Sequence, residues 1–124
     1  MNPDIEFYNL GKSGGGNMFI SARIVEANNK FKFNENDLIV VMWSTFCRID
    51  FYKTERGWIT PGNIYSQNEL SEKVVKELED FNYFLIRDFA LIELATSYLE
   101  NLPCDSIKLM SVPFDYESSM HFVK

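Results

Sequence analysis

A glycine-rich turn is the first place in this chain where residue types and spacing could support chemistry. Its sequence is Gly11-Lys12-Ser13-Gly14-Gly15-Gly16-Asn17, and it lies between the apolar run Ile5–Leu10 and a helix-compatible segment. Glycines let backbone N–H groups face a ligand or a developing negative charge, because no Cβ stands in the way. The turn lacks the residue order of a P-loop and of a dinucleotide-binding fingerprint. An anion or oxyanion site and a tight structural connection therefore both remain open.

Polar residues follow the apolar run Leu38–Trp43 and form the second candidate set. Ser44 and Thr45 come directly after the run. They could donate hydrogen bonds beside the glycine turn, since open sheets place their sites at the carboxyl ends of strands. Arg48 could clamp an anionic group. It could equally form a structural ion pair with Asp50, and the sequence does not decide between the two.

Trp58 belongs to a stretch, Thr45 to Glu69, that is dense in aromatic residues and has no clean periodicity. We expect a loop there, with Pro61-Gly62-Asn63 as a turn. Loops of this length inside compact domains are often functional. The aromatic rings could stack on sugars or bases, or they could cap the core beneath the loop, and both interpretations remain.

The C-terminal tail holds the single histidine, His121, six residues after Asp115. Ser118 and Ser119 lie between them but lack the Gly-x-Ser-x-Gly pattern of a nucleophile elbow. A lone histidine near a chain terminus has no partner at metal-ligand spacing. We interpret these residues as incidental.

Composition excludes several classes of function. The 124 residues suffice for one domain, 1–124, and 46% of them are apolar, which suits a globular core. The formal net charge of −6 argues against nucleic-acid binding and weakly against docking on anionic membranes. Cys47 and Cys104 have no Cys or His neighbours at zinc-ligand spacing. We therefore expect two reduced thiols, with a disulfide between them as the alternative, and no metal and no cofactor.

The sequence pattern shows no targeting signal. The residues before Ile5 lack the basic flank and the apolar run of a signal peptide. No stretch reaches the roughly 20 apolar residues of a membrane span. We therefore expect no membrane partner and a location in the cytoplasm.

Hydrophobic periodicity predicts the elements that would position these candidates. Three strands are expected, over Ile5–Leu10, Leu38–Trp43 and Ser106–Val112. Helices are expected over Met18–Phe31, with Asn17 as N-cap, and over Leu70–Leu102, with a break near 80–83. The middle strand does not alternate, so both of its faces should be buried. Helical crossovers between strands predict a three-layer, flavodoxin-like α/β fold with a mainly parallel sheet.

Two segments and a few later residues together resemble a known superfamily. Asn9-Leu10-Gly11-Lys12-Ser13-Gly14, a helix and then Asp37-Leu38-Ile39-Val40-Val41-Met42 look like SGNH/GDSL hydrolases. Trp43-Ser44, followed by Arg48 and Trp58, is similar to SGNH-like proteins of phages and bacterial surface-glycan clusters. The resemblance implies a serine esterase ancestry, with an acylated glycan or a small acyl compound as substrate. It implies that Gly14 gives an oxyanion N–H, that Thr45 replaces a second donor, and that Ser44, Arg48 and Trp58 line the substrate site.

The resemblance covers roughly Ile5 to Asn63 and is partial. The Gly-Asp-Ser block that carries the family's nucleophile and the Asp-x-x-His block that carries its base have no counterpart. Activated-serine catalysis lacks its machinery without them. We therefore expect the central part of such a domain, inactive as given and with an incomplete sheet. Exposed strand edges then predict marginal stability or a homo-oligomer. The alternative is a non-catalytic module that binds a glycan or a protein.

Overall fold

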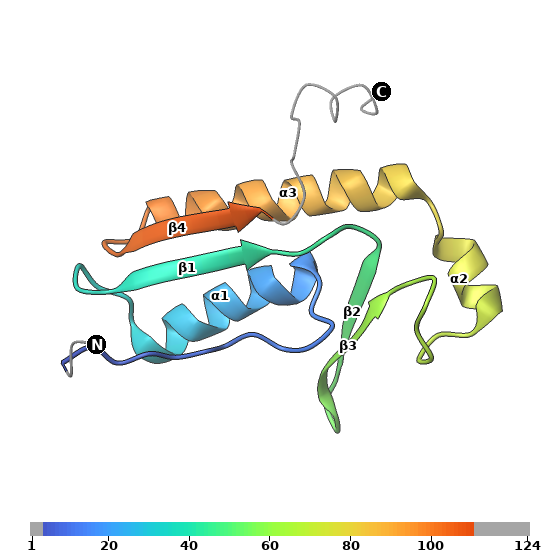
Figure 1. Cartoon of the computed structure of the whole chain (residues 1–124), viewed down its shortest axis with the longest axis horizontal. Coiled ribbons are helices and arrows are strands. Elements are labelled where there is room, and N and C mark those ends of the chain that lie inside the picture. Colours follow the sequence, from blue (N-terminus) through green and yellow to red (C-terminus); the bar gives the residue numbers. More distant parts are fainter. Residues whose placement is uncertain (1–3, 111–124) are drawn as a thin grey trace.

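The structure is a computed structural model and describes residues 4–110. Its helices and strands form a mixed α/β pattern (Figure 1). In order they are α1 (Asn17–Phe31), β1 (Leu38–Trp43), β2 (Arg48–Lys53), β3 (Gly57–Asn63), α2 (Glu72–Leu78), α3 (Phe81–Glu100) and β4 (Asp105–Met110). The α/β class, the helix after the glycine turn and the strand that follows it are therefore confirmed.

β1 and β4 form a two-stranded parallel sheet. In its register Val40 pairs with Ile107, and Met42 pairs with Leu109. The chain between the two strands contains α3, so a helical crossover joins parallel neighbours, as expected. Val112, at the end of the predicted last strand, lies outside the described residues.

The segment 5–10 is not a strand, so the predicted third parallel strand is wrong. It runs in an irregular conformation beside α1 (Figure 1), where the ring of Tyr8 lies 5.1 Å from the ring of Phe31. Phe7 is 73% exposed. In the described structure no backbone hydrogen bond joins this segment to either sheet. Apolar composition alone does not make a strand, because a strand needs a neighbour for its ladder.

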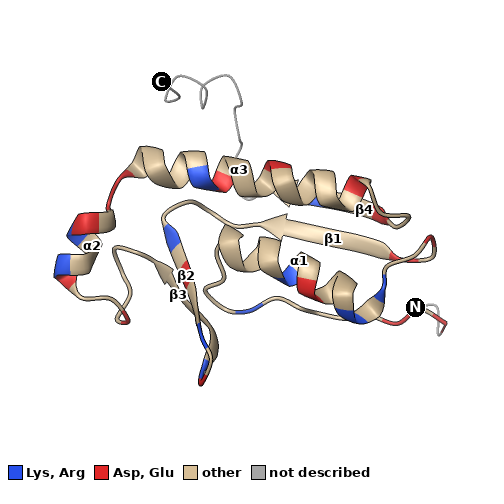
Figure 2. Cartoon of the chain, turned by 180° about the vertical axis from the view of Figure 1, so that it is seen from behind, with Lys and Arg blue, Asp and Glu red and all other residues tan. Residues whose placement is uncertain are grey.

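Both long helices cover the same face of the β1–β4 sheet. Figure 1 shows the strands in front of α1 and α3, and Figure 2, from behind, shows these helices in front of the strands. The core lies between the two layers. Its buried members are Ile24, Val41, Trp43, Ile92, Ala95, Leu99 and Cys104.

The other face of the sheet is uncovered in the described structure. It carries five large apolar side chains that are 43–64% exposed, namely Leu38, Val40, Met42, Ile107 and Leu109. We call these five residues the outer face. The prediction that both faces of β1 are buried is therefore wrong. The strand shows no alternation in sequence but alternates in burial, because helices pack on one side only.

An antiparallel hairpin occupies much of the region that the sequence predicts as a loop. β2 and β3 pair from Arg48 opposite Asn63 to Lys53 opposite Gly57, with a register shift between residues 49 and 51. Such an irregularity interrupts the alternation of apolar and polar residues, which explains the missing strand period. The hairpin follows the carboxyl end of β1 (Figure 1).

The predicted break in the long helical segment is confirmed. α2 ends at Leu78 and α3 begins at Phe81. The Asp80 carboxylate accepts hydrogen bonds from the N–H groups of Asn82 at 3.0 Å and Tyr83 at 3.3 Å. An N-cap acceptor satisfies N–H groups that a helix leaves free, so Asp80 sets the start of α3.

Candidate functional site

The glycine turn meets the hairpin at the amino end of α1, and a carboxylate from the hairpin occupies that end. Asp50 of β2 accepts hydrogen bonds from the N–H groups of Gly16 at 2.9 Å and Phe19 at 3.0 Å. The amino end of a helix attracts negative charge because its first N–H groups have no partner within the helix. Asp50 therefore fills the position in which a bound anion would lie.

The sequence suggested Asn17 as the N-cap of α1, and this prediction is wrong. Gly16 is the N-cap residue, and no side-chain cap comes from it. Asn17 is the first residue of α1 and is 0% exposed. Its side-chain amide accepts from the N–H of Ser44 at 2.8 Å and donates to the Ser44 carbonyl at 3.2 Å. These two bonds fix the glycine turn to the carboxyl end of β1.

Close packing explains two glycines of the turn. Gly14 has a φ of +78°, and a Cβ there would lie 2.2 Å from the carbonyl oxygen of Thr60 in β3. A Cβ on Gly16 would lie 2.7 Å from a carboxylate oxygen of Asp50 and 2.8 Å from the Cβ of Arg48. Packed protein atoms do not approach so closely, so the hairpin can sit on the turn only without these side chains. This packing supports the interpretation of the glycine turn as a tight structural connection.

Hydrogen bonds join β3 to the backbone of the turn. The Thr60 hydroxyl donates to the carbonyl of Ser13 at 2.7 Å. The Lys12 ammonium donates to the carbonyl of Trp58. Both bonds use backbone carbonyls as acceptors, so the hairpin and the turn hold each other in place.

Arg48 also has a structural partner, but not the expected one. Its guanidinium donates to the carbonyl of Gly15 at 3.2 Å. No ion pair with Asp50 is found within residues 4–110. The carbonyl of Arg48 accepts from the guanidinium of Arg87 in α3 at 2.8 Å. Arg48 therefore braces the turn, and its role as a clamp for an anionic group stays a prediction.

Arg87 and Asp88 of α3 add buried charge to this site. Asp88 is 0% exposed, and one of its oxygens accepts from Arg87 nitrogens at 2.7 and 2.8 Å. Burial raises the pKa of Asp88, and the charge of Arg87 opposes this shift. We call the connected set the polar junction. Its members are Asn17, Ser44, Arg48, Asp50, Arg87 and Asp88.

Cys47 is a free thiol beside the polar junction, in the loop between β1 and β2. Burial raises the pKa of this thiol, and the carboxylate of Asp88 raises it further. The thiolate is the nucleophilic form of cysteine, so this environment disfavours catalysis by Cys47. Cys104 is also free, and the structure contains no disulfide between the two.

The predicted site residues at the strand end are only partly brought together. Gly14 lies against β3, and Ser44 is held by Asn17. The Ser44 hydroxyl is buried and makes no hydrogen bond to any described residue. Thr45, by contrast, is exposed. The roles of Gly14 and Thr45 as oxyanion donors stay a prediction.

Trp58 packs on the core, which agrees with one of the two roles that the sequence allowed for it, that of capping the core. Its ring lies edge-on to Phe19 at 5.7 Å and to Tyr52 at 5.6 Å. The indole N–H donates to Glu26 of α1 at 2.9 Å. Phe19 is itself 1% exposed, so the structure favours the core cap. Stacking of this ring on a sugar stays a prediction.

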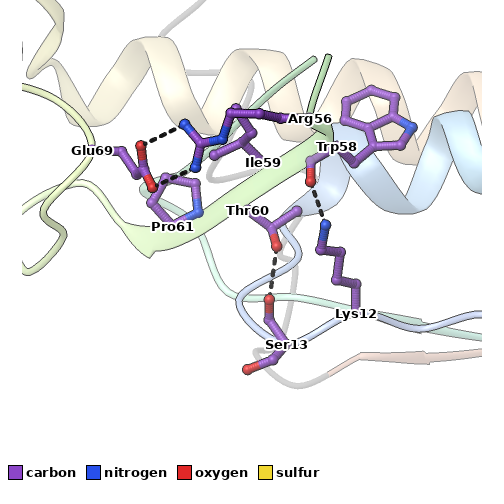
Figure 3. A pocket seen from close by; sticks show the side chains of 8 residues that line it. All are labelled: Lys12, Ser13, Arg56, Trp58, Ile59, Thr60, Pro61 and Glu69. Atoms are coloured by element: carbon purple, nitrogen blue, oxygen red, sulfur yellow. Dashed lines mark hydrogen bonds and ion pairs between the residues drawn. The ribbon is translucent and has the colours of Figure 1, made fainter. Parts of the chain in front are cut away.

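An open pocket of about 360 Å³ lies between the turn and β3 (Figure 3). Its lining residues are Lys12, Ser13, Arg56, Trp58, Ile59, Thr60, Pro61 and Glu69. Arg56 binds Glu69 through two nitrogens at 3.0 and 3.2 Å and holds the pKa of this carboxyl below its usual range. Lys12 is bonded to the Trp58 carbonyl. Because both cations have partners inside the chain, the pocket offers little to an anionic ligand.

The tail candidates His121, Asp115, Ser118 and Ser119 lie outside the described residues. Among residues 4–110, no group of three or more His, Cys, Asp or Glu side chains is placed to hold a metal ion. No helix in the same range has both the length and the apolar character needed to cross a membrane.

Sequence reasoning named Asp50 only as a partner of Arg48 and missed its bonds to the amino end of α1. It also missed the Arg87–Asp88 pair. Asp50 lies in β2, a strand that periodicity did not predict. A usable signal did exist for Asp88, because it falls on the apolar stripe of α3 between Leu85 and Ile92. A charged residue at a core-facing helix position indicates either a buried pair or a site.

Comparison of the chain with protein-family models, with curated proteins and with solved structures finds no match. The predicted relationship to SGNH/GDSL hydrolases is therefore neither supported nor contradicted by relatives. Function has to be argued from the geometry of this chain.

Proposed function

We propose that this chain is a non-catalytic assembly module, an α/β unit in which another protein covers the bare face of the parallel sheet. The observation that carries the proposal is the outer face, where five large apolar side chains are 43–64% exposed. Contiguous apolar patches of a few hundred Å² on soluble proteins often mark interaction sites. Parallel sheets are normally covered by helices on both faces. A sheet with one bare face therefore calls for a covering layer.

The polar junction supports the same proposal. N–H groups at the amino end of α1 are paired with Asp50, and the backbone of Ser44 is paired with Asn17. A ligand would have to displace these partners, and breaking a buried hydrogen bond is costly. The polar junction thus fastens α1, the hairpin and α3 together, while the outer face remains available to a partner.

Binding of the dye anilinonaphthalene sulfonate tests whether the outer face is available. The native chain is expected to enhance the dye fluorescence, and Met42→Lys is expected to reduce it. Leu94→Lys, at a residue of α3 that is 70% exposed, serves as the matched control and should leave the signal unchanged. Sedimentation velocity at several concentrations reports self-association. A folded chain that binds no dye and stays monomeric at every concentration would contradict the proposal.

A second candidate function is the serine esterase ancestry, in which this chain is part of a three-layer, flavodoxin-like domain. The bonds between Asn17 and Ser44 favour it. They bring the glycine turn to the carboxyl end of a parallel strand, where α/β folds place their sites. Gly14 and Thr45 would then contribute to an oxyanion hole.

Turnover of p-nitrophenyl acetate tests this second candidate. Activity above background that is lost in Gly14→Pro and in Thr45→Val would support it. Thr45 is exposed, so its substitution should leave the fold intact and separates lost chemistry from lost structure. Ser44, Arg48 and Trp58 would line the site for an acylated glycan. Absence of turnover together with dye binding would leave the assembly module as the function.

A further inference from the structure

We propose that the outer face docks one amphipathic helix of a partner protein, and that this helix has a basic C-terminal end. The inference rests on the assembly function proposed above and names the occupant of the same surface. Three properties of the outer face select such a helix: its size, the absence of free hydrogen-bonding groups on it, and the charge at one of its ends.

The outer face has the footprint of a single helix. Each strand has six residues, which gives a length of about 20 Å, and neighbouring strands lie about 4.8 Å apart. A helix of about 13 residues has the same length and a width of about 10 Å. The same footprint is small for a dimer of this chain, because a standard interface buries about 800 Å² on each partner.

The outer face presents side chains and no free backbone groups. The N–H and C=O groups of β1 and β4 lie in the plane of the sheet. Those between the two strands pair along the ladder, and the others point sideways at the two edges and not out of the outer face. A strand or loop laid across the apolar side chains would bury its own backbone groups without partners, which is unfavourable. A helix satisfies its backbone internally. It can therefore bury an apolar stripe against this surface.

Acidic residues mark one end of the outer face. Asp105 lies on the same side of β4 as Ile107 and Leu109, and its N–H donates to the carbonyl of Asp37 at 3.1 Å. Figure 2 shows acidic residues in the turn that leads into β1 and none along β1 itself. α1 and α3, which cover the inner face, run antiparallel to β1 and β4 (Figure 1). We assign the partner helix the same direction, which places its C-terminal end beside Asp37 and Asp105. Lys or Arg there would interact favourably with these carboxylates and with the helix dipole.

Titration with labelled synthetic peptides of about 14 residues, followed by fluorescence anisotropy, tests the inference. The first peptide has leucines at helical spacing, glutamines on its polar face and two lysines in its last turn. The second replaces the two lysines with glutamates. The third has the composition of the first, with leucines at every second position. We expect the first to bind the chain most tightly, the second to bind more weakly at low salt, and the third not to bind.

Variants of the chain locate the binding. Met42→Lys should weaken binding of the first peptide at least about tenfold, since it places a charge in an apolar contact. Met42→Glu should weaken binding of this peptide to a similar extent if the cause is burial of a charge. It should not do so if the cause is repulsion between the new lysine and the lysines of the peptide. Leu94→Lys should bind like the native chain.

Three results would overturn the inference. The first is that both Met42 variants bind the first peptide as tightly as the native chain does. The second is that the alternating peptide binds as tightly as the first peptide. The third is that the chain forms a dimer whose formation excludes the first peptide. In the last case a second copy is the occupant. If the dye marks the outer face but the first peptide does not bind, the helix is wrong and the assembly module stands. If the dye also fails to bind, both proposals fail.

Discussion

β1 carries two contrasting regions, the polar junction at its carboxyl end and the outer face along one side. In the polar junction, Asn17 and Asp88 are fully buried. Asn17 is bonded to Ser44 at the end of β1, and Asp88 is bonded to Arg87 of its own helix. On the outer face, Val40 and Met42 are 57% and 64% exposed. Gly14, Arg48 and Trp58, whose types suggested chemistry, thus contact other parts of the fold, whereas Thr45 is exposed. Residues of β1 whose types suggested only a core role face outward.

This contrast shows how function should be read in a small α/β unit. A glycine turn before a helix can bind an anion, but here Asp50 takes that place, and Gly14 is explained by contact with Thr60. An apolar strand is usually core, but here half of its side chains have no cover among the described residues. The proposed assembly function therefore rests on the uncovered apolar surface and not on the types of the polar residues.

Gly14→Ala is expected to have the largest effect and would test whether the hairpin packs on the glycine turn beside the polar junction. The new Cβ meets the backbone of Thr60 at a positive φ, so the free energy of unfolding should fall by about 3 kcal/mol or more. Gly57→Ala is the matched control. Gly57 has a φ of +76° but no atom within 4 Å of the added Cβ, so only about 1 kcal/mol should be lost. Urea denaturation measures both, and equal losses would mean that the hairpin does not sit on the turn.

Asp50→Ala is expected to have the next largest effect, because it removes both hydrogen bonds to the amino end of α1. The free energy of unfolding should fall by about 2 kcal/mol. Asp50→Asn keeps one acceptor and should lose about half as much. Phosphate should then stabilise Asp50→Ala more than the native chain, since the vacated helix end accepts an anion. An unchanged urea midpoint in Asp50→Ala would show that this cap is not formed in solution.

Local patterns predicted the elements that are defined by nearby residues. The spacing of apolar residues located α1 and β1, and the break before α3 depends on Asp80, which acts within three residues. The predictions for the segment 5–10 and for the hairpin were wrong for a common reason. A strand depends on its neighbour, and neither the absence of a partner for 5–10 nor the bulge in β3 is visible in local composition.

The site could be predicted only as a location. The glycine turn and the end of β1 do meet, as strand ends and turns in open sheets should. The hydrogen bonds that hold the site could not be found, because Asp50 is 34 residues from Gly16 and Arg87 is 39 residues from Arg48. The outer face could not be predicted either. The sequence Leu38–Trp43 is apolar on both sides, and only tertiary packing decides which side the helices cover.

Asp88 gives the polar junction a pH dependence of definite sign, with an effect smaller than the two above. Burial raises its pKa in the folded state, so the folded chain binds this proton more tightly than the unfolded chain. Asp88 therefore favours folding more as the pH falls from above the raised pKa toward the ordinary value of 3.8, and less as the pH rises. Asp88→Asn does not titrate. Urea denaturation at several pH values measures the free energy of unfolding of both proteins. On acidification the native chain should gain stability relative to Asp88→Asn. A relative loss would mean that the charge of Arg87 lowers the pKa of Asp88 more than burial raises it.

Met42→Lys is expected to have the smallest effect on stability, although it should weaken binding at the outer face. A side chain that is 64% exposed makes few contacts, so the free energy of unfolding should change by less than about 0.5 kcal/mol. Val41→Lys, one residue away and 5% exposed, should by contrast unfold the chain, because it buries a charge in the core. If Met42→Lys instead costs about 2 kcal/mol or more, the outer face is covered in solution. If the destabilisation by Met42→Lys disappears on dilution, a second copy of the chain covers the outer face. If it does not depend on concentration, another part of this chain covers the outer face.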